Sequence, residues 1–388
     1  MLAAVYRLLV CLFGIGLLGF RYEEVISSEM NQDHLIKLIG SSGSPYTRKM
    51  IALLRYRRIP YSVIWGDPRT YLKELGIDPP KPVLLPVCLL QEGENVKAVC
   101  DSTPIIRSLE SEFQTRSVIP HDPVLAFINY LLEDFADEWI TKYMFHYRWH
   151  FDDDIENAEK ILPLWHQINL NDELRQNFGK QISAIQINRL WVVGSNEQTA
   201  SMIESSYIRF LSILESHLSD YKYLFGSRPS SADFAFYGQL TQLTKVDPTP
   251  RTLAEQHSSR TIAWVDIIED LSGLEPHKED WLGIENAPSL LKELLCEVGK
   301  TYVPAMLANA RAIRAGEDTW TTEIDKTDWT QKTFSYQAKC LKWLQEEFQS
   351  KSSIILGTDK ARNYVSDTDF HISRIFSWHP IYWRKYFW

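Results

Sequence analysis

The chain has 388 residues, of which 45% are hydrophobic and 13 are tryptophan, and its formal charge at pH 7 is −9. A chain of this length can bury a large core, and the length suggests two or more domains. The acidic balance argues against nucleic acid as a partner, because no basic stripe offsets the repulsion of the phosphates. The five scattered cysteines fit a reducing compartment better than a disulfide scaffold.

Residues 1–30 form an apolar N-terminal extension. The run from Leu8 to Phe20 follows Arg7 and resembles a signal segment or a short membrane anchor, but it is short for a transmembrane helix. Met30 stands just before the first predicted strand. We favour an over-long start or a weak anchor over secretion, so the expected location is cytoplasmic, or alternatively membrane-associated through residues 1–20.

The pattern after this extension predicts an α/β domain over residues 31–118 and an all-helical domain over residues 122–388. In the first domain we expect a strand over 35–39, a helix after Ser44, strands over 60–64, 83–90 and 96–100, and a closing helix over 105–113. In the second we expect helices over 124–149, 154–178, 198–220, 231–244, 253–272, 287–315 and 328–349.

The turn from the first strand into the first helix has the character of an anion or thiolate site. Ser44 at the N-cap and Pro45 at the first helical position form a strong helix start, because proline needs no amide partner there. The amides of the first turn carry partial positive charge, which stabilises an anion or a thiol that is losing its proton. Ser44 is therefore placed to act on a bound sulfur, and a plain N-cap is the competing interpretation.

The turn at Ser44 has the spacing of a redox Cys-x-x-Cys motif, with Ser44 and Thr47 at the cysteine positions. Two further motifs accompany it. In Val83-Leu84-Leu85-Pro86-Val87, proline interrupts an apolar run, and a cis bond between Leu85 and Pro86 would explain it. Asp101-Ser102-Thr103-Pro104 ends the next strand and starts a helix. Together and in this order, the three motifs resemble the glutathione S-transferase superfamily.

The resemblance implies a thioredoxin-like N-terminal domain, an enlarged helical C-terminal domain, and glutathione as co-substrate. Ser44 would activate the thiol, and the backbone at Leu85, before Pro86, would pair with the cysteinyl part. Asp101 and Ser102 would hold the γ-glutamyl end. The chemistry agrees, because Ser102 and the helix amides suit a carboxylate, whereas Asp101 suits an ammonium group.

The first helix of the second domain is dense in aromatic rings, and the resemblance implies that it lines a pocket for an apolar electrophile. The candidate pocket residues are Tyr46, Trp139, Tyr143 and Tyr147. Core packing is the alternative for these rings. His146 and His150 lie one turn apart but lack a clear third ligand, so we predict no metal site.

The same helix carries two like-charge pairs four residues apart, Glu133 with Asp137 and Asp134 with Glu138. These carboxylates need donors or cations from other parts of the chain. General acid–base chemistry or a metal site is the functional interpretation, and a solvated or salt-bridged helix face is favoured over it.

Three smaller features complete the prediction. Ser230 and Asp233 have the spacing of a capping box, which is a folding device. Cys88 and Cys100 lie near the expected site, where small buried hydrophobes are favoured over redox thiols. The aromatic stretch over 376–388 is expected to pack on the helical domain, with a pocket lid or a membrane anchor as alternatives.

The leading hypothesis is glutathione-dependent transfer to an apolar electrophile, as in detoxification, with Ser44 activating the thiol. The alternative is a non-catalytic binding or scaffold protein of the same fold, associated with membranes through its N-terminus. A glutathione lyase or oxidoreductase is weakened, because serine and threonine replace both redox cysteines. The resemblance also implies a homodimer.

Overall fold

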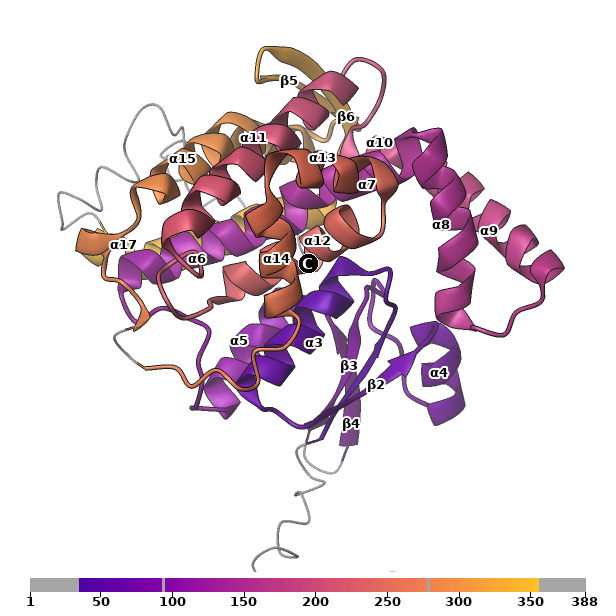
Figure 1. Cartoon of the computed structure of the whole chain (residues 1–388), viewed down its shortest axis with the longest axis horizontal. Coiled ribbons are helices and arrows are strands. Elements are labelled where there is room, and N and C mark those ends of the chain that lie inside the picture. Colours follow the sequence, from indigo (N-terminus) through magenta and orange to yellow (C-terminus); the bar gives the residue numbers. More distant parts are fainter. Residues whose placement is uncertain (1–34, 93–94, 278–279, 356–388) are drawn as a thin grey trace, which may run out of the picture. The chain divides into compact units, whose positions relative to one another are not determined.

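The computed structural model describes residues 35–92, 95–277 and 280–355, and a four-stranded sheet lies in the N-terminal part of the chain, within residues 36–100 (Figure 1). The strands are β1 (Ile36–Gly40), β2 (Tyr61–Trp65), β3 (Val87–Glu92) and β4 (Asn95–Cys100). Their order is β2-β1-β3-β4, with β1 parallel to β2 and antiparallel to β3. The parallel pair requires a crossover, which α3 (Pro45–Arg57) supplies.

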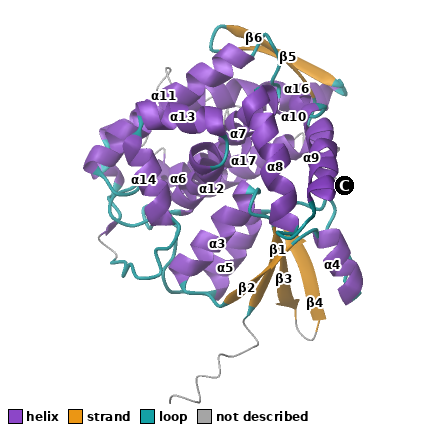
Figure 2. Ribbon diagram, turned by 45° about the vertical axis from the view of Figure 1, so that its right-hand side comes forward, coloured by secondary structure: helices purple, strands orange, loops and turns teal. Residues whose placement is uncertain are grey.

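Helices cover both faces of this sheet. Figure 2 shows α3 and α5 (Ser102–Glu112) to one side of the strands and α4 (Pro68–Leu75) to the other. Leu72 of α4 packs with Ile39, Val87 and other strand residues in a small core of its own. The predicted thioredoxin-like α/β arrangement is confirmed, although α4 was not predicted despite its start signals, Asp67 and Pro68.

The proline-rich approach to β3 differs in detail from the prediction. The Leu85–Pro86 bond is cis, as predicted, and the Lys81–Pro82 bond is cis as well. The strand begins at Val87 rather than at residue 83. Proline has no amide hydrogen to donate to a strand ladder, so regular pairing starts only after Pro86.

The rest of the chain is mainly helical. The long helix predicted over 124–149 is α6 (Pro123–Phe135), the π-helical turn η2 (Ala136–Ile140) and α7 (Thr141–His150). The helices after it are α8 (Asp152–His166), α9 (Asp172–Ile187), α10 (Leu190–Val193), α11 (Ala200–Asp220), α12 (Ser231–Lys245), α13 (Pro248–His257), α14 (Ser259–Ile268), the short η4 (Ile284–Asn286), α15 (Ser289–Glu297), the π-helical η5 (Val298–Tyr302), α16 (Val303–Ala315) and α17 (Ser335–Ile355).

One hairpin departs from the all-helical expectation for this region. Strands β5 (Thr319–Ile324) and β6 (Thr327–Lys332) pair across a turn at Asp325 and Lys326, whose φ angles are 48° and 64°. Trp320 and Trp329 are buried on this hairpin. The helix expected over 328–349 therefore begins later, at Ser335.

The core joins the sheet to the helices, and α12 is its most buried helix. The predicted capping box at its start is confirmed, because the Ser230 amide donates to Asp233 Oδ2 at 2.8 Å and both halves of the box are present. Gly238 marks the closest approach of α12 to α3. A β-carbon at this position would lie 2.4 Å from the Pro45 carbonyl oxygen, so only glycine fits.

Some predictions fall on residues that the structure does not describe. The anchor over residues 1–20 and the aromatic stretch over 376–388 both lie outside the described residues. Of the helices that the structure does describe, none is both long enough and apolar enough to cross a lipid bilayer.

Candidate functional site

The register of the sheet brings the three sequence motifs to one edge. Ile39 of β1 pairs with Val87 of β3, and Val87 pairs in turn with Cys100 of β4. The turn after β1 therefore leads to Ser44 at the same edge where Leu85 precedes β3 and where Asp101 follows β4. Motifs that are well separated in the sequence thus form three adjacent corners in the structure.

The first corner is the N-terminus of α3. Ser44 is 7% exposed, and its Oγ accepts a hydrogen bond from the Thr47 amide at 3.3 Å. The N-cap interpretation is thus confirmed. Within the described part of the chain, no hydrogen bond uses the hydroxyl hydrogen of Ser44, so this hydrogen is available to a bound acceptor. Thiol activation by Ser44 stays a prediction.

Side chains from the helical region hold the loop before Ser44. Arg148 donates to the Gly43 carbonyl oxygen at 3.3 Å, and Gln242 donates to that of Ser42 at 3.2 Å. Arg148 is itself fixed by Asp247, which its Nε contacts at 2.8 Å. The position of this corner therefore depends on both halves of the molecule.

Helix α8 supplies an apolar wall beside the same loop. A β-carbon on Gly43 would lie 2.8 Å from the Trp165 ring and 3.0 Å from Leu162. Neither residue was singled out from the sequence, because α8 belongs to the stretch around 150–200 that the expected family domain does not account for. A single tryptophan and leucine on an amphipathic helix carry no signal of their own.

The second corner is the cis-proline segment. Pro86 is buried, whereas Leu85 is partly exposed. Leu85 lies just before β3, and its backbone amide and carbonyl form no hydrogen bond with any described residue. Free backbone groups beside a strand are suited to pairing with an extended peptide.

The third corner combines an unusual backbone at Asp101 with a hydrogen bond from a distant tyrosine. Asp101 has φ 84° and ψ 109°, a conformation that costs a non-glycine residue about 1–3 kcal/mol. Its Oδ2 accepts a hydrogen bond from the Tyr336 hydroxyl at 2.8 Å. Burial raises the pKa of Asp101, although the Tyr336 hydrogen bond and the charge of Lys49 oppose this effect.

Ser102 lies over a buried cation. Its Oγ accepts from Lys49 Nζ at 3.0 Å, and Lys49 also contacts Glu133 at 2.9 Å and Asp137 at 2.7 Å. Burial opposes the charge of Lys49, but the two carboxylates outweigh it and raise the pKa of the lysine. Ser102 therefore stands next to a protonated lysine whose charge is shared with two buried carboxylates.

The acidic segment behind this corner is buried, so the solvated-face interpretation is wrong for it. Glu133 is 0% exposed, and Asp137 and Glu138 are each 8% exposed. The salt-bridged interpretation holds for Glu133 and Asp137, which share Lys49. In the described ranges, no group of three or more His, Cys, Asp or Glu side chains is arranged to hold a metal ion.

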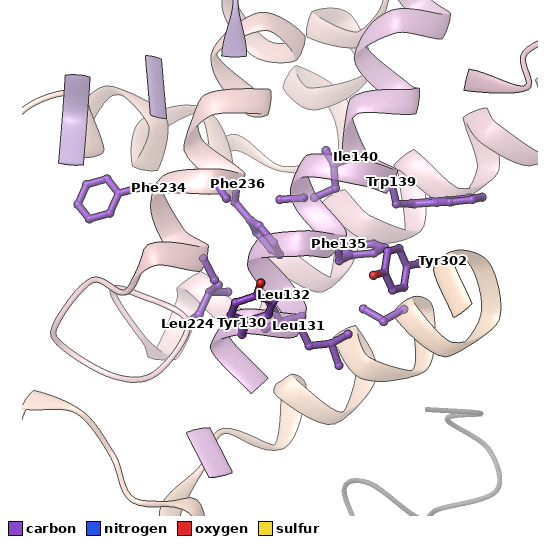
Figure 3. Close-up of a cluster of buried hydrophobic side chains, with 14 of the residues drawn as sticks. Tyr130, Leu131, Leu132, Phe135, Trp139, Ile140, Leu224, Phe234, Phe236 and Tyr302 are labelled. Carbon is purple, nitrogen blue, oxygen red and sulfur yellow. The ribbon is translucent and has the colours of Figure 1, made fainter. Parts of the chain in front are cut away.

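The predicted pocket rings lie elsewhere. Tyr46 directs its hydroxyl to the Asp137 carbonyl oxygen at 2.7 Å, between α3 and η2. Trp139, Tyr143 and Tyr147 are at most 1% exposed, and Figure 3 shows Trp139 close to buried Phe135 and Tyr302. This is the core-packing alternative. A role of these rings in a co-substrate pocket stays an untested prediction.

The cysteines near the site are free thiols. Cys88 is buried, and burial raises its pKa to about 12, so its thiol stays protonated. Cys100 is partly exposed, and burial raises its pKa as well. Raised thiol pKa values favour the inert interpretation over a redox role.

Comparisons with known proteins give two family matches. The family model described as "Glutathione S-transferase, N-terminal domain" matches residues 38–117, and "Glutathione S-transferase, C-terminal domain" matches residues 197–274. Glutathione S-transferase U8 of Arabidopsis thaliana is 29% identical over 100 residues, which is 24% of this chain and 41% of that protein. The chain thus spans about two fifths of the length of this curated relative.

The solved structures that match part of the chain include three from different organisms. A GST-like protein from Pseudomonas syringae is 18% identical, with a TM-score of 0.37, covering 60% of this chain and 66% of its own. A glutathione S-transferase from Methylobacterium radiotolerans, in complex with glutathione sulfonate, is 17% identical with a TM-score of 0.32, covering 63% and 99%. The Tau class enzyme of mango, Mangifera indica, is 18% identical with a TM-score of 0.34, covering 63% and 94%.

Proposed function

The chain belongs to the glutathione S-transferase superfamily, and we propose that it binds glutathione along one edge of its sheet and transfers the thiol to an apolar electrophile. The observation that carries this proposal is the register Ile39–Val87–Cys100, which places three suitable corners side by side. All three corners lie within residues 38–117, the range of the N-terminal family match.

Each corner offers what one part of glutathione needs. The γ-glutamyl carboxylate would lie on Ser102 and the first amides of α5, with the charge of Lys49 behind them. The ammonium group would contact Asp101. The cysteinyl amide and carbonyl would pair with the free backbone groups of Leu85, as an added strand does. These contacts would leave the sulfur beside Ser44.

Ser44 would then make the thiol more acidic. Its hydroxyl donates to the sulfur, and the N-terminus of α3 adds partial positive charge, so the thiolate is favoured over the thiol. The thiol proton passes to solvent. The thiolate forms a bond to carbon of the electrophile, and the leaving group departs with its electron pair. Holding both reactants in place contributes most of the remaining acceleration.

The electrophile would lie against α8 rather than against the buried rings of α7. Trp165 and Leu162 are partly exposed and contact Gly43, the residue next to Ser44. An apolar wall beside the loop that leads to Ser44 suits an aromatic or aliphatic electrophile. Because these contacts are apolar, they select for size and shape more than for a particular polar group.

The test separates binding from thiol activation. Ser102→Ala is expected to weaken glutathione binding about tenfold in calorimetric titration, since a hydrogen bond to a charged group is lost. Ser44→Ala is expected to keep binding but to slow conjugation of a chlorodinitrobenzene about tenfold or more. The thiol pKa seen in the pH profile of kcat/KM should rise by about one unit.

Ser44→Thr is the matched control, because threonine keeps both the hydroxyl and the N-cap. It should behave like the original chain, whereas Ser44→Ala also loses about 1 kcal/mol of stability through the lost cap. Unchanged turnover and thiol pKa in Ser44→Ala would remove the serine from the mechanism. Absence of glutathione binding at millimolar concentration would favour the non-catalytic scaffold of the same fold.

A further inference from the structure

Asp101 is contacted by a part of the chain that lies outside both family matches. The Tyr336 hydroxyl donates to Asp101 Oδ2 at 2.8 Å, across 235 residues of sequence. Tyr336 belongs to α17, which begins at Ser335, whereas the matched ranges end at residues 117 and 274. The ammonium end of the proposed glutathione site is therefore built partly from the C-terminal extension.

The fold fixes the position of the Tyr336 hydroxyl. Two residues earlier, the Phe334 amide donates to Asn309 Oδ1 at 2.8 Å, and Asn309 Nδ2 donates to the Phe334 carbonyl oxygen at 2.9 Å. Asn309 is fully buried in α16, so this reciprocal pair anchors the start of α17. One turn after Tyr336, buried Cys340 holds the same helix against the core.

The contact with Tyr336 orients the carboxylate of Asp101 and leaves other lone pairs free to accept hydrogen bonds. A carboxylate has about four lone-pair sites, and within the described residues the Tyr336 hydroxyl is the donor that hydrogen-bonds to Asp101. Sites remain for an ammonium group. Burial also raises the pKa of the Tyr336 phenol, so the hydroxyl stays protonated and can act as a donor at neutral pH.

We infer that Tyr336 is a positioning residue for ammonium recognition, and that α17 thereby completes the γ-glutamyl end of the glutathione site. The inference rests on the proposed function. On this strained backbone, the directed hydrogen bond from Tyr336 selects one orientation of the Asp101 carboxylate. With Tyr336 in place, Asp101 meets the ammonium group already oriented, and binding orders one side chain fewer.

The experiment compares two ligands and two matched variants. The ligands are glutathione and its analogue that lacks the α-amino group, both titrated calorimetrically into the full chain. Tyr336→Phe removes the hydroxyl that donates to Asp101. Tyr302→Phe is the control, because it removes another tyrosine hydroxyl that donates to a carboxylate, that of Asp134. Thermal unfolding of each variant checks that the fold is retained.

The expected result is specific to one ligand. Tyr336→Phe should weaken glutathione binding about five- to tenfold and leave binding of the des-amino analogue unchanged. Tyr302→Phe should change neither. Asp101→Asn should also lose the preference for glutathione, and Tyr336→Phe should add nothing in that background, because the two side chains act as one unit.

Other outcomes overturn the inference in distinguishable ways. Equal weakening of both ligands by Tyr336→Phe would make the tyrosine merely structural, and tighter glutathione binding would make it a competitor for Asp101. A preference lost in Asp101→Asn but kept in Tyr336→Phe would overturn the role of Tyr336 alone. An original chain that binds neither ligand would overturn the proposed function together with this inference.

Discussion

The two faces of the acidic segment in α6 and η2 meet the same electrostatic problem in different ways. On one face, Glu133 and Asp137 share the buried cation Lys49. Burial works to raise the pKa of Glu133, but the charges of Lys49 and Arg107 outweigh it and lower the pKa to about 2. Burial raises the pKa of Asp137 to about 6 despite the same lysine.

The opposite face, with Asp134 and Glu138, has no such cation in contact. No ion pair joins either carboxylate to another described residue, and their hydrogen-bond partners are neutral groups, among them the Tyr302 hydroxyl and Cys340. The charge of the buried Lys142 acts on Glu138 and opposes the rise of its pKa. Burial raises the pKa of Asp134 to about 7 against the Tyr302 hydrogen bond. Burial and the charge of Asp134 raise the pKa of Glu138.

The difference shows how like charges four residues apart are tolerated inside a protein. A carboxylate that faces a cation keeps its charge, whereas one that faces neutral donors takes up a proton near neutral pH. The segment therefore carries less charge than its sequence suggests. Only the face toward α3, behind Ser102, contributes a full ion pair to the proposed site.

Removing the cation should have the largest effect. Lys49→Met leaves Asp137 without a cation and Glu133 with Arg107 alone, so the free energy of unfolding at pH 7 should fall by about 3–5 kcal/mol in urea denaturation. The carboxylates should respond by binding protons, so the loss should be smaller at a pH of about 5. A loss below about 1 kcal/mol, or one that does not depend on pH, would contradict the role given to Lys49.

Removing a carboxylate from the opposite face should increase the free energy of unfolding at neutral pH rather than decrease it. The folded-state pKa of Asp134, about 7, lies above its ordinary value of 3.8, so the native state holds a proton that the unfolded chain releases. Stability should therefore fall as pH rises from about 4 to 7. Asp134→Asn keeps an acceptor for Tyr302 and should flatten this decline.

At a pH of about 7.5, Asp134→Asn should be more stable than the original chain by about 1–2 kcal/mol, and at a pH of about 4.5 the two should be nearly equal. Urea midpoints at both pH values measure the difference. The sign of the stability difference at the higher pH distinguishes the two cases. If Asp134→Asn is less stable than the original chain there, Asp134 is ionised and stabilised by a nearby positive charge, as Glu133 is.

A solvent-exposed ion pair should contribute least to stability, and its removal serves as a reference for the other two substitutions. Arg251 and Glu255, at 3.0 Å, have side chains that are 55% and 50% exposed. Arg251→Ala should change the free energy of unfolding by only about 0.3 kcal/mol, because solvent screens the pair. A change as large as that of Lys49→Met would mean that burial does not explain the comparison.

Local signals made much of the site predictable. The N-cap at Ser44, the cis bond before Pro86 and the capping box at Ser230 are each encoded within a few neighbouring residues. Strand register then follows from the order of the motifs. The two domain boundaries, 118 and 122, stay predictions.

Contacts between distant segments were not predictable in the same way. Lys49 looks like any lysine within a helix, and only the packing of α3 against α6 shows that it is buried. Tyr336 reaches Asp101 from the other end of the chain. The rings of α7 have the same periodicity whether they line a pocket or fill a core, so the sequence could not show that they are buried.

The contact at Gly238 ties the reactive corner to the helical half. Because the α12 backbone touches the Pro45 carbonyl, the first turn of α3 rests directly on another helix with no side chain as a cushion. A methyl group added at Gly238, which is far along the chain from Pro45, would collide with the Pro45 carbonyl oxygen. It would therefore displace the first turn of α3, which Ser44 caps. The N-terminus of α3, and Ser44 with it, is thus held by direct backbone contact with α12, so the position of this corner is set when the helical half of the chain folds.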